Sequence, residues 1–123
     1  MLLNYYYSIK SRETDGEITR FNIMLHEDCD IYKGHFPGAP VAPGVCNIQM
    51  IKECAEQLTG KQLLLTYIPQ CKFSTLITPR QYPDLQVRIR ILEQNDAQIK
   101  INAGIGPENM DFLTLKGDYS FIN

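Results

Sequence analysis

Residues 34–49 change character half-way along, and this change constrains the fold more than any other feature of the chain. The stretch up to and including Gly44 contains three prolines and three glycines, so residues 37–44 form neither a regular helix nor a strand. From Gly44 onward the apolar residues recur at helical spacing, and Thr59-Gly60 supplies a stop signal. The sequence therefore predicts one helix that runs from about Gly44 to Leu58. Its apolar stripe consists of Val45, Ile48, Ile51, Ala55 and Leu58.

Most of the remaining chain alternates apolar and polar residues, as strands with one buried face do. Asp15-Gly16 and Asn95-Asp96 are turn signals between neighbouring strands. Cys46, Met50 and Cys54 make the helix apolar beyond its stripe, which indicates that a wrapped sheet encloses it. Strands on both sides of a single long helix predict an α+β fold in which an antiparallel sheet packs against that helix. The predicted strands cover residues 5–10, 21–25, 63–68, 85–91, 97–105 and 113–121.

The composition is that of an ordinary soluble globular protein, since 44% of the 123 residues are hydrophobic and 21% are charged. This length supports one domain, residues 1–123, and is too short for two. The net charge of −2 provides no basic field for nucleic acid, and the longest apolar run is too short to span a membrane. Residues 1–7 lack a basic region and a small-residue cleavage site, so we expect no signal peptide.

The cysteines and histidines do not form a recognisable metal-binding pattern. No two cysteines are spaced as Cys-x-x-Cys, and we expect free thiols in a reducing cytoplasm. The two histidines do not cluster with the cysteines at ligand spacing, so we expect no zinc site and no other metal or cofactor. The four cysteines are Cys29, Cys46, Cys54 and Cys71.

Three short motifs ahead of the helix carry a family resemblance. They are His35-Phe36-Pro37-Gly38, Pro40-Val41 and Pro43-Gly44-Val45. With them the stretch 34–49 resembles the 3-hydroxyacyl-[acyl-carrier-protein] dehydratases of fatty acid synthesis. A looser similarity covers Cys71-Lys72-Phe73 and the turn between Pro79 and Asp84. The resemblance implies the hot dog fold, in which a curved antiparallel sheet wraps a long helix, and it implies a dimer.

The resemblance also implies roles for individual residues. His35 matches the base that removes the α-proton beside the thioester, and the carbonyl of Val41 would hold its imidazole in the required tautomer. Gly44 matches the residue whose N–H binds the thioester oxygen, on which negative charge builds as the proton leaves. A helix start supplies free N–H groups and a favourable dipole for that charge, and a glycine lets the substrate approach closely. The residues implied to contact the substrate are Phe36, Pro37, Gly38, Val41 and Val45.

The position of the family's catalytic acid holds Gln49 in this chain. In the family a carboxylic acid here protonates the departing β-hydroxyl group. A carboxamide can hydrogen-bond a hydroxyl or a water, but it has no proton to give near neutral pH. Help from a general acid is typically worth about 10²–10⁴-fold in rate. The sequence therefore predicts an impaired site unless another group replaces the acid.

Two replacements for the acid are conceivable. Glu53 lies one helical turn further along, on the same face as Gln49, and could serve as a substitute acid. A competing interpretation places Glu53 and Glu56 on a solvated or interface edge of the helix. Alternatively, the acid comes from another protein, because the family builds each site from the histidine of one protomer and the acid of the other. A heterodimer with an acid-bearing relative would then contain one complete and one inactive site.

Three functions follow from these alternatives. The first is a dehydratase-like hydro-lyase that acts on 3-hydroxyacyl thioesters of acyl carrier protein or CoA, in fatty acid or polyketide-type synthesis. The second is a non-catalytic or half-catalytic subunit, paired with a related hot dog protein. The third is a hot dog acyl thioesterase, which would need a carboxylate to activate water. For each, the expected assembly is a homodimer or a heterodimer, without nucleic acid or membrane. A basic rim for an acidic carrier protein, with scattered solubilising charge as the alternative, would comprise Lys33, Lys52, Lys72, Arg80, Arg88 and Arg90.

Overall fold

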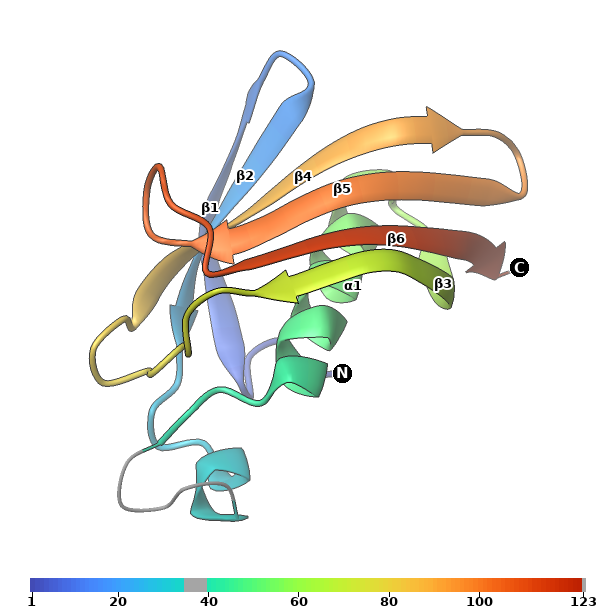
Figure 1. The fold of residues 1–123 in the computed structure, drawn as a ribbon. Helices are drawn as coiled ribbons and strands as arrows, with labels where there is room; N and C mark the ends of the chain where they lie inside the picture. Colours follow the sequence, from blue (N-terminus) through green and yellow to red (C-terminus); the bar gives the residue numbers. More distant parts are fainter. Residues whose placement is uncertain (35–39, 123) are drawn as a thin grey trace.

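The computed structural model describes residues 1–34 and 40–122, which form an antiparallel sheet and one long helix (Figure 1). The elements, in chain order, are β1 (Tyr7–Asp15), β2 (Ile18–Leu25), the short 3-10 helix η1 (Asp30–Gly34), α1 (Gly44–Thr59), β3 (Gln62–Phe73), β4 (Asp84–Gln94), β5 (Gln98–Gly106) and β6 (Leu113–Ile122).

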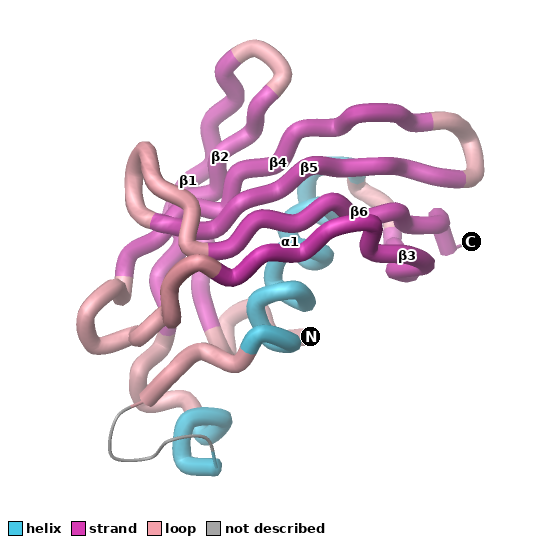
Figure 2. Tube along the Cα trace, viewed as in Figure 1, coloured by secondary structure: helices cyan, strands magenta, loops and turns pink. Residues whose placement is uncertain are grey.

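The six strands form one sheet in the order β1-β2-β4-β5-β6-β3, and every neighbouring pair is antiparallel. The sheet curves, and α1 lies against its inner face (Figures 1 and 2). Strand β3 follows the helix in sequence but pairs with the last strand, which places the end of β3 beside the start of α1. The predicted α+β architecture, a curved antiparallel sheet around a long helix, is confirmed.

The core lies between α1 and the inner face of the sheet. The helix contributes Met50, Ile51, Cys54 and Ala55, all buried. The alternation that predicted the strands decides which strand residues face the helix, because successive side chains in a strand point to opposite sides. The buried apolar side chains of β4 and β5 are Leu85, Val87, Ile89, Ile99, Ile101, Ala103 and Ile105.

The observed helix, Gly44–Thr59, agrees with the predicted span to within one residue. Gly60 ends it in the left-handed conformation (φ 70°) and donates its N–H to Glu56 O. The predicted apolar stripe is wrong at Val45, which is 76% exposed. Val45 belongs to the first turn, whereas the buried face of the helix begins at Asn47.

Two of the three tyrosines near the start of the chain are buried in the core. The predicted strand at 5–10 forms as β1, from Tyr7 to Asp15. Tyr6 and Tyr7 are fully buried, and their hydroxyl groups donate to Asn47 Oδ1 (2.8 Å) and Glu53 Oε1 (3.1 Å). Two polar side chains on the inner face of α1 are thereby satisfied by the segment that precedes and opens the sheet.

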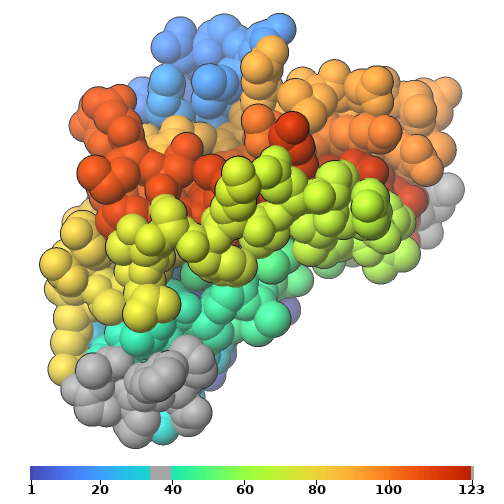
Figure 3. Space-filling model, viewed as in Figure 1, coloured from blue at the N-terminus to red at the C-terminus, as the bar shows by residue number. Residues whose placement is uncertain are grey.

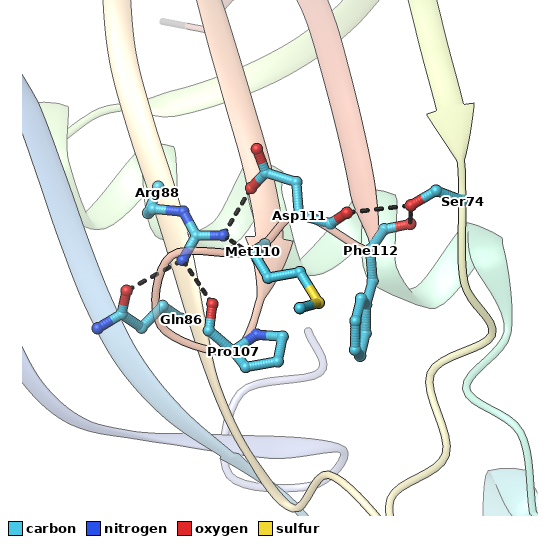
Figure 4. Close-up of polar contacts among 7 residues, drawn as sticks. All are labelled: Ser74, Gln86, Arg88, Pro107, Met110, Asp111 and Phe112. Carbon is cyan, nitrogen blue, oxygen red and sulfur yellow. Dashed lines mark hydrogen bonds and ion pairs between the residues drawn. The ribbon is translucent and has the colours of Figure 1, made fainter.

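Arg88 of β4 holds the turn between β5 and β6 against the outer face of the sheet (Figure 4). Its guanidinium donates to the side chains of Gln86 and Asp111 and to the carbonyls of Pro107 and Met110. The same turn reaches the residue after β3, because Ser74 Oγ donates to the carbonyls of Asp111 (3.0 Å) and Phe112 (3.2 Å). We call these residues, shown together in Figure 4, the Arg88 cluster.

Two glycines make room for that turn. A Cβ at Gly104 would overlap the carboxylate of Asp111, and a Cβ at Gly106 would overlap the carbonyl of Met110. Arg88 is only 17% exposed, and Arg90 pairs with Glu17 at 2.9 Å. Two arginines of the predicted basic rim, Arg88 and Arg90, therefore already have partners within the chain, and Arg88 acts as a structural clamp.

The sheet has two edges, and the β3 edge is apolar. The side chains of Leu64, Tyr67 and Phe73 are exposed on β3, and Leu76 is exposed in the following loop. Residues of β3 lie at the surface along the visible face of the molecule (Figure 3). An edge strand with exposed apolar side chains favours pairing with another chain. Within residues 1–34 and 40–122, no helix has the length and apolar character needed to cross a membrane.

Candidate active site

The start of α1 offers backbone N–H groups without acceptors inside the helix. Pro43 caps the helix in an extended conformation (φ −64°, ψ 138°), and its carbonyl accepts from the amides of Cys46 and Asn47, both at 3.1 Å. The Gly44 N–H precedes these bonded amides and has no acceptor among the described residues. This geometry is what binding of a thioester oxygen to the Gly44 N–H would require.

Phe73 explains why the first helical residue is a glycine. A Cβ on Gly44 would lie 3.0 Å from the Cζ atom of Phe73 and 3.1 Å from Cε1. The ring therefore sits directly against the helix start, in space that any other residue would partly fill. Phe73 ends β3, and its neighbour Ser74 is held by the Arg88 cluster. The wall beside Gly44 is thus built by the sheet.

The segment that leads into the helix is tied to the loop after β3. Pro40 and Ala42 are buried, and the Ala42 N–H donates to Ile77 O at 2.7 Å. Val41, between them, is half-buried. Residues 35–39 lie outside the described residues, so the roles assigned to His35, Phe36, Pro37 and Gly38 stay predictions from the sequence.

Gln49 and Glu53 form a hydrogen-bonded pair on α1. The side-chain amide of Gln49 donates from Nε2 to Glu53 Oε2 at 2.9 Å. The helical spacing that placed the two residues on one face therefore brings them into direct contact. The position expected to hold the acid presents an amide, and that amide is engaged with the carboxylate considered as its substitute.

The carboxylate of Glu53 is buried and accepts four hydrogen bonds. Besides Gln49, its donors are the N–H groups of Leu2 (2.8 Å) and Leu3 (2.9 Å) and the hydroxyl of Tyr7 (3.1 Å). Burial, with smaller contributions from Cys54 and Glu53, raises the pKa of Tyr7 well above its ordinary value, so Tyr7 remains the donor. Glu53 is 2% exposed, and the interpretation that it lies on a solvated or interface edge is wrong.

The described residues provide an N–H at a helix start, a ring at Phe73 and a polar side chain at Gln49. The acyl-thioester site predicted from the sequence would need such groups. The two oxygens of a carboxylate have about four acceptor positions in total, and the four donors around Glu53 fill them. Glu53 is therefore anchored to the first residues of the chain. Among the described residues, no group of three or more His, Cys, Asp or Glu side chains is placed to hold a metal ion.

A protein-family model and curated relatives place this chain among the dehydratases. The model of the ApeI-like family, described as ApeI dehydratase, matches residues 10–114. A 3-hydroxyacyl-[acyl-carrier-protein] dehydratase FabZ of Levilactobacillus brevis is 30% identical over 82% of this chain and 69% of its own length. The chain belongs to the ApeI-like dehydratase family. It is a dehydratase-like protein with the hot dog fold, as its sequence motifs predicted.

The share of each relative's own length that this ApeI-like chain matches differs from one relative to the next. The FabZ dehydratase of Lactobacillus helveticus is also 30% identical, over 68% of this chain and 60% of its own length. The chain therefore spans between three fifths and about two thirds of these two relatives. The family model runs from residue 10, within β1, to residue 114, near the start of β6, so it includes every predicted site residue.

Solved structures confirm the fold of this ApeI-like chain. The dehydratase heterocomplex ApeI:P from Xenorhabdus doucetiae superposes with a TM-score of 0.70, at 19% identity over 91% of this chain and 96% of that one. A thioesterase of Lactococcus lactis superposes with a TM-score of 0.69, at 11% identity over 96% and 93% of the two chains. At these identities the likeness shows the hot dog fold alone, so it does not distinguish the dehydratase from the thioesterase function.

Sequence analysis missed several residues that shape this member of the ApeI-like family. The Leu2 and Leu3 amides act through the backbone and leave no sequence signal. Tyr7 was visible only as part of an aromatic run. Phe73 belongs to the looser part of the family match, and its position in that match was the one available signal.

Proposed function

We propose that this chain works as a subunit of a dehydratase for 3-hydroxyacyl thioesters, in which it supplies the base and the thioester-binding amide but not the acid. The observation that carries the proposal is the Gln49–Glu53 pair. Gln49 stands at the acid position and has no acidic proton, and Glu53 is buried with four donors around its carboxylate. The acid must therefore come from outside this pair.

The proposed chemistry divides the reaction between two groups of this chain and one that it lacks. His35 removes the α-proton, and the thioester oxygen gains negative charge that the Gly44 N–H stabilises at the helix start. Loss of the β-hydroxyl as water then requires a proton donor. If Glu53 gave that proton, the hydrogen bonds that order the first residues of the chain would have to rearrange. An acid carried by a partner subunit avoids this cost.

The exposed edge of β3 supports an assembly with a second hot dog subunit. Leu64 and Tyr67 project from an edge strand that has no further strand beside it among the described residues. Phe73, which packs on Gly44, lies on the same strand, so a partner bound there lies next to the helix start. One solved structure with this fold is a dehydratase heterocomplex, which supports a different subunit as the partner over a second copy.

The substrate we propose is an acyl thioester on a carrier protein or CoA. The FabZ relatives carry the acyl-carrier-protein substrate in their names, which supports this choice. The proposed location is the cytoplasm, where free thiols such as Cys54 persist. Burial raises the pKa of the Cys54 thiol to about 12, which keeps it unreactive in the core.

The test is hydration of a trans-2-enoyl thioester, followed by the loss of enoyl absorbance. We expect the homogeneous chain to be nearly inactive, and the chain co-purified with an acid-bearing hot dog relative to be active. His35→Ala in this chain should abolish the activity of that complex, whereas His26→Ala, which changes the other histidine, should preserve it. Full activity of the homogeneous chain, lost in Glu53→Gln, would contradict the proposal and identify Glu53 as the acid.

A further inference from the structure

The middle of β3 departs from regular pairing with β6. The register shifts on both sides of Tyr67, so two bulges interrupt the strand near its centre. The residues of β3 that the register leaves out are Thr66, Ile68 and Pro69. A proline in a sheet is confined to an edge strand, to a strand's first residue or to a bulge, because it has no N–H to donate. Pro69 lies in a bulge of an edge strand.

Neighbouring hydrogen bonds show which way the backbone at Pro69 faces. The Ser74 N–H donates to Phe112 O at 2.9 Å, so Ser74 faces the segment that leads into β6. Successive residues of a strand direct their backbone groups to alternate sides, and the last four residues of β3 keep a constant register with β6. The N–H groups of Cys71 and Phe73 therefore face away from β6, toward the edge where no described strand lies (Figure 1). Pro69 is the next position in this row, and it provides no N–H there.

The β3 edge therefore both favours and restricts a partner strand. The exposed side chains of Leu64 and Tyr67 favour association, whereas a proline and a bulge are features by which proteins limit pairing at a sheet edge. If two β3 strands pair antiparallel over their full length, the two-fold axis lies at the middle of the strand, and each copy brings its own bulges and its own Pro69. A different partner strand meets these features once. The missing N–H thus weakens a homodimer twice and a heterodimer once.

We infer that Pro69 is a specificity-determining residue of the β3 edge, which disfavours a second copy of this chain and favours a related hot dog subunit whose own edge strand is unbroken. The inference rests on the proposed function, which supplies the partner subunit, and adds the residue that selects it. The occupant of the edge is a regular strand with N–H and C=O groups free along one side. It pairs with the two regular parts of β3, residues 62–65 and 70–73, on either side of Pro69.

Sedimentation equilibrium of the complete, homogeneous chain tests this inference. We expect the wild type to be mainly monomeric at micromolar concentration, and Pro69→Thr to dimerise about five- to 150-fold more tightly, the range for two net hydrogen bonds. Gln70→Thr introduces the same side chain at the next residue, which is exposed and already pairs with Lys116 of β6, and it should leave the association unchanged. Equal association of the wild type and Pro69→Thr, as monomers or as dimers, would overturn the inference.

A second measurement uses the wild type and does not depend on a variant. Amide hydrogen exchange at Cys71 and Phe73 should be fast in the homogeneous chain and slow in its complex with an acid-bearing hot dog relative. The Lys72 amide, which faces β6, should exchange slowly in both samples. Fast exchange at Cys71 and Phe73 in an active complex would overturn the inference and leave the proposed function standing. Slow exchange there in an inactive complex would overturn the proposed function alone, and fast exchange in an inactive complex would overturn both.

Discussion

Two polar clusters are built in the same way but differ in what they leave free. One lies on the outer face of the sheet and the other on the inner face of the helix. In the Arg88 cluster a guanidinium donates to four acceptors from β4 and the β5–β6 turn. In the Gln49–Glu53 pair a carboxylate accepts from four donors, three of which come from residues 2, 3 and 7. Each cluster fastens a distant segment to a regular element through one charged side chain.

The clusters differ in what remains free once the charge is satisfied. Around Arg88 the partners are mainly carbonyls and carboxylates that end in the cluster, and the result is a rigid turn. On α1 the last member, Gln49, donates from its amide nitrogen to Glu53, and its amide oxygen accepts from none of the described residues. A charge with a complete set of partners therefore serves the structure, whereas an oriented polar atom without such a partner remains available to a further group.

The largest expected effect comes from placing an acid at position 49 itself. Gln49→Glu should raise hydration activity of the homogeneous chain by up to about 10²–10⁴-fold, the range for a general acid. Glu53 lies in hydrogen-bond contact, and two carboxyl groups so close cannot both ionise. Because Glu53 keeps three other donors, the introduced carboxyl should hold the proton, with its pKa raised. Enoyl-thioester hydration, measured across pH, checks this.

The pH profile and two further variants make that prediction specific. A carboxyl that must be protonated loses its effect as pH rises through its raised pKa, so the gained activity should fall on the alkaline side. His35→Ala should remove the whole gain, because base and acid act on one substrate. Gln57→Glu adds the same charge at an exposed position of α1 and should leave activity unchanged. A gain that persists in the His35→Ala background would show that the two residues do not share a site.

A large effect on stability is expected at Glu53. Glu53→Ala leaves the donors of Leu2, Leu3, Tyr7 and Gln49 without their acceptor, and we expect it to lower the free energy of unfolding by about 3 kcal/mol. Glu53→Gln keeps one carbonyl acceptor and should cost about half as much. Urea denaturation measures both. Hydrogen exchange at the Leu2 and Leu3 amides should accelerate in each variant, and unchanged protection there would disprove the anchoring role.

The positions of the two clusters show what the sequence could and could not predict. Helical apolar spacing from Gly44 and the stop at Gly60 fixed the helix to within a residue, since both signals are local. The contact between Gln49 and Glu53 follows from helical periodicity. The burial of Glu53 does not, because its other donors lie about fifty positions away in the chain and two of them are backbone groups.

Arg88 illustrates the same limit on the outer face. Its alternation with Val87 and Ile89 correctly placed it on the solvent side of β4. Both interpretations from the sequence, a docking rim and scattered solubilising charge, left Arg88 without partners in the chain. Nothing near Arg88 in the sequence indicates that a turn about twenty residues later folds over it. Two glycines make that folding possible. Gly104 appears in the sequence only as an interruption of a strand, and Gly106 only as the first residue of the turn that follows the predicted strand 97–105. Contacts between distant segments that are made through backbone carbonyls leave no pattern in the sequence.

A smaller effect separates the clamp from an ordinary surface charge. Arg88→Met should lower the free energy of unfolding by about 1–2 kcal/mol, because several acceptors of the β5–β6 turn lose their donor. Arg90→Met, on the same strand, breaks an exposed pair with Glu17 and should cost less than about 0.5 kcal/mol. Thermal or urea unfolding of the two variants gives the comparison, and equal losses would contradict the clamp.

The smallest expected effect tests the link between the sheet and the helix start. Gly44→Ala gains helix propensity, at most about 0.5–1 kcal/mol, but its Cβ would lie 3.0 Å from the Phe73 ring. Phe73 is more than half exposed and can yield, so we expect the two contributions nearly to cancel in the free energy of unfolding. In a Phe73→Leu background the same Gly44→Ala change should become stabilising. If Gly44→Ala stabilises equally in both backgrounds, the ring does not set the glycine requirement, and close approach of the thioester is left as its cause.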